Sequence, residues 1–234
     1  MSAGAWVRRY NPSMVIVHHL NNSRSQRVLW LLEELGVPYE VKRYERDAKT
    51  MLAPPQLLAV HPLGKSPVIE DGDVKMAESG AVISYLVDRY GAGRLIPPAG
   101  SAEYWRYIYW LHYAEGSAMT PLLLRLVFNR VANGPAPWPI SVVARHIART
   151  VDGAFIAPNL KRHLDFMESE LQARSWFAGN EFTACDVQMS FPLEAAAARA
   201  GLNSTRPNLM AFLGRIHARD AYKRALERGG PYEY

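Results

Sequence analysis

Two short motifs hold the residues with the clearest chemical potential: the pair Ser66-Pro67 and the pair Glu78-Ser79. A residue before proline is biased towards extended backbone, and its peptide bond can be cis, which would expose the amide and carbonyl of Ser66. Glu78-Ser79 precedes an apolar stripe at helical spacing, and free amides at a helix start attract a carboxylate. The Glu78 carboxylate would pair with an ammonium. These motifs therefore predict a ligand that carries both charges, as an amino acid does.

The segment between the two pairs is predicted to be a β-hairpin. Val68-Ile69 and Val74-Lys75-Met76 are apolar or β-branched runs, and Asp71-Gly72 between them is a strong turn signal. The following helix is expected to present Val82, Tyr85 and Leu86 to the core. The hairpin would thus set the distance between the two motifs.

A second group of polar residues, at positions 21–27, lies where the first strand gives way to the first helix. The positive end of that helix would stabilise a thiolate. Lowering a thiol pKa of about 8.5 by two units requires about 2.7 kcal/mol, which one hydroxyl hydrogen bond and the helix dipole can supply. Ser23 and Gln26 also fit a capping box, so an alternative role for Ser23 is that of an N-cap.

Residues 61–85 resemble the glutathione-binding half of cytosolic glutathione S-transferases. The shared pattern is Asn/His-Pro, Gly, one residue, Val/Ile-Pro, a hairpin, and Glu-Ser-x-Ala-Ile. The chain departs from it at Ser66, where an aliphatic residue is usual, and at Gly80-Ala81-Val82. Neither change removes a backbone contact, and the resemblance extends from residue 14 to about residue 213.

The resemblance implies roles for individual residues. In serine-type members the activating hydroxyl lies four residues before a helix arginine, and Ser23 stands in that relation to Arg27. Ser23 is the implied catalytic residue, donating a hydrogen bond to the glutathione thiolate, with Asn22 and Ser25 as alternative donors. Lys65 is expected to reach the glycine carboxylate of glutathione. The expected substrate-binding residues are Asn22, Lys65, Ser66, Pro67, Glu78 and Ser79.

The order of predicted elements around these motifs is that of a thioredoxin-like domain. An apolar strand at 14–18, a helix ending at Gly36, a strand at 39–44 and a short helix near Leu57 precede the hairpin and its helix. Glycines and prolines at 91–100 indicate a linker. The chain is therefore predicted to be α/β followed by all-α, with domains at 14–93 and 101–234.

The second half is expected to be helical throughout. Its first helix starts at Ser101 and carries an aromatic stripe from Tyr104 to Tyr113, expected to form core and domain interface. Residues 133–139 break the pattern, and a helical region from about 142 to 171 has a boundary at Pro158. Thr183 and Asp186 predict a capped helix start, a recurrent feature of the family.

Composition excludes several classes of protein. The chain has 234 residues, a formal net charge of +5, one cysteine and seven histidines without metal-ligand spacing. No run of about 18 apolar residues occurs, the N-terminal residues lack a secretory apolar core, and no dense basic run indicates nucleic-acid binding. A single cysteine forbids an internal disulfide. A cytoplasmic protein with no metal, no nucleic-acid partner and no membrane span is expected.

The predicted function is that of a glutathione S-transferase. Glutathione would be the co-substrate, its thiol attacking a small hydrophobic electrophile or a peroxide, and the protein is expected to be a homodimer, of the serine type found in bacteria and fungi. Two alternatives stay open: a glutathione-disulfide-dependent reductase, suggested by Asn21 and Asn22, and a non-catalytic binding or regulatory protein on the same fold.

Overall fold

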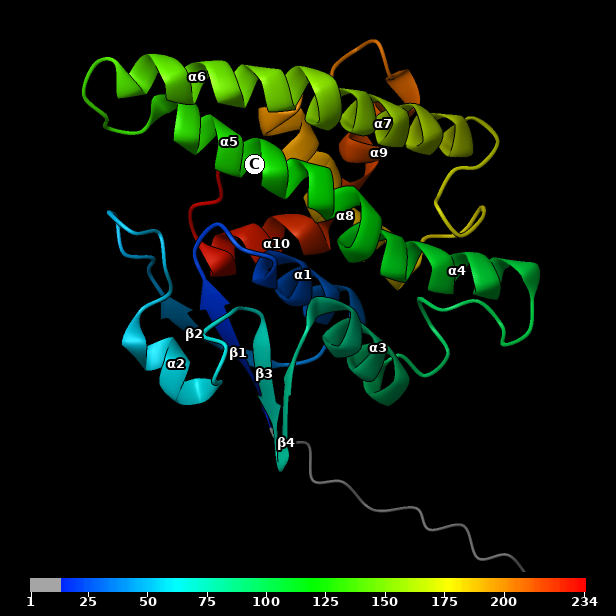
Figure 1. The fold of residues 1–234 in the computed structure, drawn as a ribbon. Coiled ribbons are helices and arrows are strands. Elements are labelled where there is room, and N and C mark those ends of the chain that lie inside the picture. Colours follow the sequence, from blue (N-terminus) through cyan, green and yellow to red (C-terminus); the bar gives the residue numbers. More distant parts are fainter. Residues whose placement is uncertain (1–13) are drawn as a thin grey trace, which may run out of the picture.

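The computed structural model describes residues 14–234; the predicted N-terminal extension lies outside them. The first half contains β1 (Val15–Leu20), α1 (Ser25–Leu35), β2 (Tyr39–Tyr44), α2 (Pro55–Val60), β3 (Val68–Asp71), β4 (Val74–Ala77) and α3 (Ser79–Tyr90). The strands form one sheet in the order β2-β1-β3-β4 (Figure 1). Strand β1 pairs in parallel with β2 and antiparallel with β3, and β3 and β4 form the predicted hairpin. The thioredoxin-like prediction is confirmed.

Helix α1 carries the core of this half and positions the loop before it. Its apolar residues repeat at helical spacing, so Val28, Leu31 and Leu32 are fully buried, and Leu35 nearly so. The helix ends at Gly36, which adopts a φ of 69° that favours glycine. Helix α1 contacts β1, α3, α8 (Ala184–Arg199) and α10 (Asp220–Gly229). The loop at its N-terminus is therefore held between the sheet and the helical half.

The second half is all helical, as predicted. Helices α4 (Ala102–Tyr113) and α5 (Met119–Asn133) are joined by a π-helical turn, Ala114–Ala118, and α6 (Ile140–Val151) and α7 (Ala157–Gln172) by another, Asp152–Ile156. The predicted boundary at Pro158 lies just after this second turn. Helices α8, α9 (Pro207–His217) and α10 complete the chain (Figure 1).

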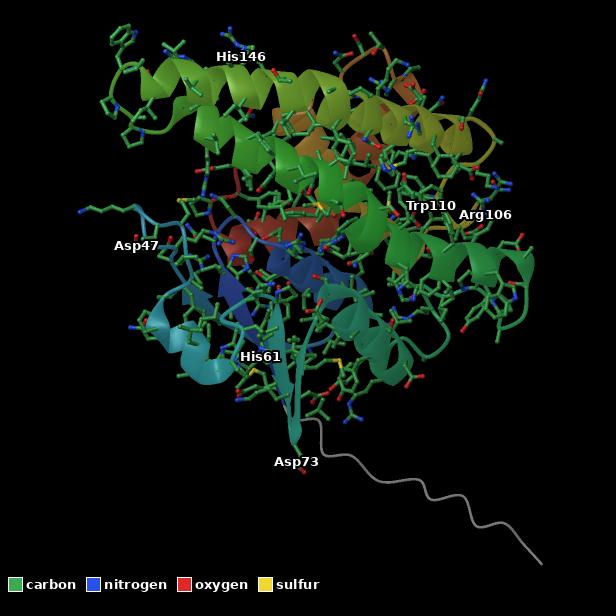
Figure 2. The ribbon with its side chains drawn as sticks, viewed as in Figure 1. Asp47, His61, Asp73, Arg106, Trp110 and His146 are labelled. Carbon is green, nitrogen blue, oxygen red and sulfur yellow. The ribbon has the colours of Figure 1, made fainter. Side chains whose placement is uncertain are left out.

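The aromatic residues of α4 fall on two faces of the helix, one buried and one exposed, as their spacing requires. Tyr107, Trp110 and Tyr113 are buried, while Trp105 is 64% and Tyr109 49% exposed. Figure 2 shows Trp110 on the side of α4 that faces the other helices. Trp110 packs against Phe177, with ring centroids 4.6 Å apart. The buried part of the stripe is therefore core, as the sequence predicted.

The predicted capping box opens α8, the central helix of this half. The Asp186 carboxylate accepts hydrogen bonds from the backbone amides of Thr183 and Phe177, at 2.8 and 2.9 Å.

Residues 91–101 connect α3 to α4. The domain limits 14–93 and 101–234 agree with these helix ends and stay a prediction. Among residues 14–234, no helix is long and apolar enough to cross a membrane.

Candidate active site

A cavity of about 200 Å³ lies beside the hairpin and the start of α3. Five of the predicted substrate-binding residues line it together: Lys65, Ser66, Pro67, Glu78 and Ser79. His61 at the end of α2 lines it as well, and the helical half contributes Glu115. The two motifs that the sequence placed 12 residues apart therefore meet in one pocket, as a ligand with two charged ends requires.

The Ser66-Pro67 peptide bond is cis, as expected. The Ser66 hydroxyl donates to the carbonyl of His18 at 2.7 Å and accepts from the amide of Leu20 at 3.2 Å. The side chain that departs from the family pattern is thus satisfied by the end of β1. It ties the turn to β1, the strand that precedes the loop of residues 21–24.

Glu78 stands at the N-cap of α3 with a φ of 72°, a conformation that is costly for a residue with a side chain. Its exposed carboxylate does not cap the helix. Ser79 is the first residue of α3 and is only 4% exposed. Glu78 thus lines the pocket with an exposed carboxylate, while the adjacent Ser79 hydroxyl lies at the helix end that attracts anions.

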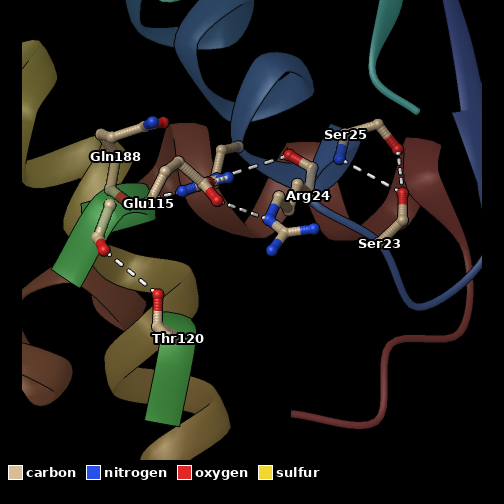
Figure 3. Close-up of polar contacts among 8 residues, drawn as sticks. Ser23, Arg24, Ser25, Glu115, Thr120 and Gln188 are labelled. Carbon is tan, nitrogen blue, oxygen red and sulfur yellow. Dashed lines mark hydrogen bonds and ion pairs between the residues drawn. The ribbon is translucent and has the colours of Figure 1, made fainter. Parts of the chain in front are cut away.

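Ser23 belongs to a chain of hydroxyl groups at the start of α1. Its Oγ lies 2.7 Å from the Oγ of Ser25, which lies 2.9 Å from Nδ1 of His19 (Figure 3 shows the two serines). Ser23 Oγ also accepts from the Ser25 amide at 3.3 Å and lies 3.5 Å from Ser66 Oγ. Ser23, Ser25 and His19 are all buried, and Ser23 is only 4% exposed.

The protonation state of His19 decides which group donates in each hydrogen bond among Ser23, Ser25 and His19. Burial, with Arg43 nearby, lowers the pKa of His19 to about 4, so its ring is neutral at pH 7. The backbone of Gly229 accepts a hydrogen bond from the ring, which leaves Nδ1 as the acceptor that faces Ser25. Ser25 therefore donates to His19 and must accept from Ser23. The Ser23 proton is thus directed to Ser25 in this structure.

An ion-pair cluster links the start of α1 to the helical half. Arg27, 1% exposed, donates to Glu115 at 2.5 Å and to the carbonyl of Gln188 at 2.6 Å. Arg24 reaches the other Glu115 oxygen at 2.8 Å (Figure 3). Burial alone would raise the pKa of Glu115, but the two guanidinium groups outweigh it and hold that pKa below its ordinary value. Arg24 and Glu115 both line the pocket.

The alternative interpretation of Ser23 as part of a capping box with Gln26 is wrong. The N-cap of α1 is Arg24, without a side-chain cap, and both side-chain polar atoms of Gln26 lack a partner within residues 14–234. The reason is that the helix begins two residues after Ser23. The Ser23 hydroxyl instead accepts from the Ser25 amide, one residue earlier than the Gln26 amide that a box requires.

Asn22 lies outside the pocket lining in this structure. It adopts a φ of 48°, and its Oδ1 accepts from the backbone amide of Glu233 at 3.0 Å. Its side-chain oxygen is therefore engaged by the segment that follows α10. Its predicted contact with substrate stays a prediction.

No group of three or more potential metal ligands occurs within residues 14–234. His18 and His19, adjacent on β1, have separate partners, since His18 bonds the Tyr44 hydroxyl at 2.8 Å. Figure 2 shows His61 beside the sheet and His146 on the outer side of α6, far apart. The histidines therefore supply no shared site in the described part of the chain.

Sequence reasoning missed three contributors: Arg24, Glu115 and His19. Glu115 lies in a π-helical turn of the other half, and no spacing rule connects it to residues 90 positions earlier. Arg24 directly follows the predicted serine, but its position in the sequence indicates no role for it. His19 offered one usable signal, since a histidine at the end of a buried strand just before a polar loop is placed to bond that loop.

A thioredoxin-like half with a cis-proline turn, followed by a helical half, and a pocket for a ligand with two charges define the cytosolic glutathione transferase class. The glutathione S-transferase N-terminal domain matches residues 12–88, and the C-terminal domain matches residues 157–220. The chain belongs to the glutathione S-transferase family.

Relatives span nearly the whole chain. Glutathione S-transferase 3 of Schizosaccharomyces pombe is 34% identical over 92% of this chain and 88% of its own length. Glutathione S-transferase 1 of Saccharomyces cerevisiae is 31% identical over 92% and 95%. A glutathione S-transferase structure from Actinobacillus pleuropneumoniae is 32% identical, covers 92% of this chain and 93% of its own, and has a TM-score of 0.74.

Proposed function

We propose that this glutathione transferase is of the serine type, with Ser23 donating a hydrogen bond to the thiolate of bound glutathione. The observation that carries the proposal is the set of hydrogen bonds among the three hydroxyl groups. The Ser25 hydroxyl donates its hydrogen bond to His19, and the Ser66 hydroxyl donates its hydrogen bond to the His18 carbonyl. Ser23 therefore holds the one hydroxyl proton of the three that can turn from Ser25 to a ligand. The N-terminus of α1 adds favourable potential at the same place.

The pocket suggests how glutathione lies. Its ammonium would meet the Glu78 carboxylate, and its γ-glutamyl carboxylate would meet the Ser79 hydroxyl and the first amides of α3. Its glycine carboxylate would meet Lys65. The backbone of Ser66 would pair with the cysteinyl residue as an added strand does, which directs the thiol towards Ser23.

The reaction is attack of the glutathione sulfur on a small hydrophobic electrophile or a peroxide. The thiol proton leaves to solvent, because the neutral His19 ring, with a pKa of about 4, is too weak a base to hold it at neutral pH. The sulfur then forms its new bond as the leaving group departs. Turnover of glutathione with an aryl halide and with a hydroperoxide tests the proposal, and failure with every electrophile class would refute it.

Removing the charged anchors should weaken glutathione binding. Glu78→Gln and Ser79→Ala are each expected to cost about 1 to 3 kcal/mol of binding free energy, because each removes a partner of a charged group. Asp73→Asn is the matched control, since Asp73 lies at the exposed tip of the hairpin (Figure 2). Calorimetry with unchanged affinity in both pocket variants would discard this orientation of glutathione.

We propose a homodimer, supported by an exposed apolar stripe on the α5–α6 pair. The stripe comprises Leu123, Val127 and Val131 on α5, and Ile140, Val143 and Ile147 on α6, each between 46% and 59% exposed. An uncovered stripe of this kind is typical of an interaction surface.

Light scattering at micromolar concentration should give twice the chain mass of 26.3 kDa. Val143→Asp should shift the protein to monomer, because it places a charge within the stripe. His146→Asp, on the same helix but outside the stripe, should not. A wild-type mass of one chain would refute the dimer.

A cytoplasmic location is proposed as well. The reaction consumes reduced glutathione, and the one cysteine, Cys185, is fully buried.

A further inference from the structure

The segment 230–234, which follows α10, crosses from the catalytic loop to the helical half. The Glu233 amide bonds Asn22, the neighbour of Ser23, at 3.0 Å. The next ring, that of Tyr234, packs on Phe191 of α8 with centroids 5.0 Å apart, and the Arg199 guanidinium lies 4.5 Å from the Tyr234 ring centroid. Two adjacent residues, Glu233 and Tyr234, thus link the loop that carries Ser23 to α8.

A buried carboxylate anchors this segment. Glu194 of α8 is 2% exposed and accepts hydrogen bonds from the hydroxyls of Tyr222, at 2.5 Å, and Tyr232, at 2.6 Å. His217 lies 3.0 Å from the same carboxylate. Tyr232 is therefore fixed to the helical core, whereas Tyr234, two residues later, is held by ring contacts alone in the described structure.

Tyr234 lines a small apolar hollow between α5 and α8, together with Met119, Leu122, Phe191, Ala195 and Arg199. The hollow has a volume of about 50 Å³. A dry apolar cavity of about 150 Å³ is known to hold benzene, so this hollow is too small for an aromatic ring while Tyr234 is in place. The hollow adjoins the start of α1, because the guanidinium groups of Arg24, which also lines the glutathione pocket, and Arg27 lie over the Phe191 ring.

We propose that the Tyr234 ring occupies the space that the body of an aromatic electrophile takes during the reaction, which makes Tyr234 a specificity-determining residue. The ring of an aromatic electrophile would take the place of the Tyr234 ring, stacking on Phe191 and facing the Arg199 guanidinium. The reactive carbon of the electrophile would then point to the glutathione sulfur beside Ser23. A small aliphatic electrophile needs no such displacement. This inference rests on the proposed function and adds the substrate class that its second site admits.

The test compares Tyr234→Ala with Tyr234→Phe at saturating glutathione. Tyr234→Ala should raise kcat/KM for an aryl halide about 5- to 70-fold, the size expected for losing the Phe191 ring pair and the Arg199 cation–π contact. It should leave kcat/KM for iodomethane and the KM for glutathione within about 2-fold, because the glutathione pocket contains no residue of the segment. Tyr234→Phe, which keeps the ring, should behave as the wild type does.

A second readout needs no turnover. The fluorescent probe anilinonaphthalene sulfonate, an aromatic anion that suits Phe191 and Arg199, should bind Tyr234→Ala more tightly than wild type, with unchanged circular dichroism. An unchanged or lower kcat/KM for the aryl halide, or unaltered probe binding, would overturn the inference. Absence of any turnover in the wild type would instead refute the proposed function, and the probe would still test the hollow.

Discussion

Replacing Ser23 with alanine is expected to lower kcat/KM at neutral pH about 10- to 100-fold while changing glutathione affinity about threefold or less. A hydrogen bond to a charged partner contributes about 1.5 to 3 kcal/mol, or about one to two pKa units of the thiol. The lost bond acts on the thiolate and not on the charged anchors of glutathione, so rate and affinity should separate. Steady-state kinetics and calorimetry on the same preparations check the prediction.

Ser25→Ala is the matched control for this variant. It removes a hydroxyl of the same chain, but one whose proton is already held by His19. We expect a much smaller change in rate and some loss of stability, because Nδ1 of His19 is left without its donor. If Ser25→Ala shows the larger loss of rate and Ser23→Ala keeps full activity, Ser25 is the donor and the assigned direction of the protons is wrong.

Replacing Glu115 with alanine is expected to destabilise the protein by about 3 to 5 kcal/mol, because it leaves the buried Arg27 guanidinium without its counter-charge. The free energy of unfolding in urea measures the loss. The double variant Arg27→Met/Glu115→Leu should be more stable than Glu115→Ala, since apolar pairs often replace buried ion pairs at little cost. A Glu115→Ala variant as stable as the wild type would show that the cluster does not hold the two halves together.

The same pair has a predicted pH signature. The pKa of Glu115 lies below its ordinary value of 4.5 in the folded protein. Its contribution to stability is therefore fully present above about pH 4.5 and is lost as the pH falls through the lower folded pKa. The free energy of unfolding of Glu115→Gln should vary less with pH in that acidic window than that of the wild type.

The sequence sufficed for elements whose determinants are local. The end of α1 follows from Gly36, and the start of α8 from Thr183 and Asp186. The hairpin was predicted as well, but its turn lies one residue later than Asp71-Gly72, at Gly72-Asp73, because Asp71 is the last residue of β3 and pairs with Val74. The glutathione pocket was also predictable in part, because Ser66, Pro67, Glu78 and Ser79 lie within one supersecondary unit whose geometry is fixed by the hairpin.

The rest of the site depends on contacts between distant parts of the chain. Glu115 reaches Arg27 only because α8 packs against both α1 and the π-helical turn that carries Glu115, and Tyr234 reaches Phe191 only because α10 lies on α1. Tertiary packing of this kind carries no spacing code. The false capping box with Gln26 has a local cause: the pattern was present, but the helix begins one residue later than the pattern assumes.

The most direct test of the account is a pH titration of the thiolate absorbance of glutathione bound to the wild-type protein and to Ser23→Ala. The account predicts an apparent thiol pKa in the wild-type complex at least about one unit below the free value of about 8.5, and its return towards the free value in Ser23→Ala. A wild-type complex whose thiol titrates as free glutathione does, or a Ser23→Ala complex with an equally lowered thiol pKa, would contradict it.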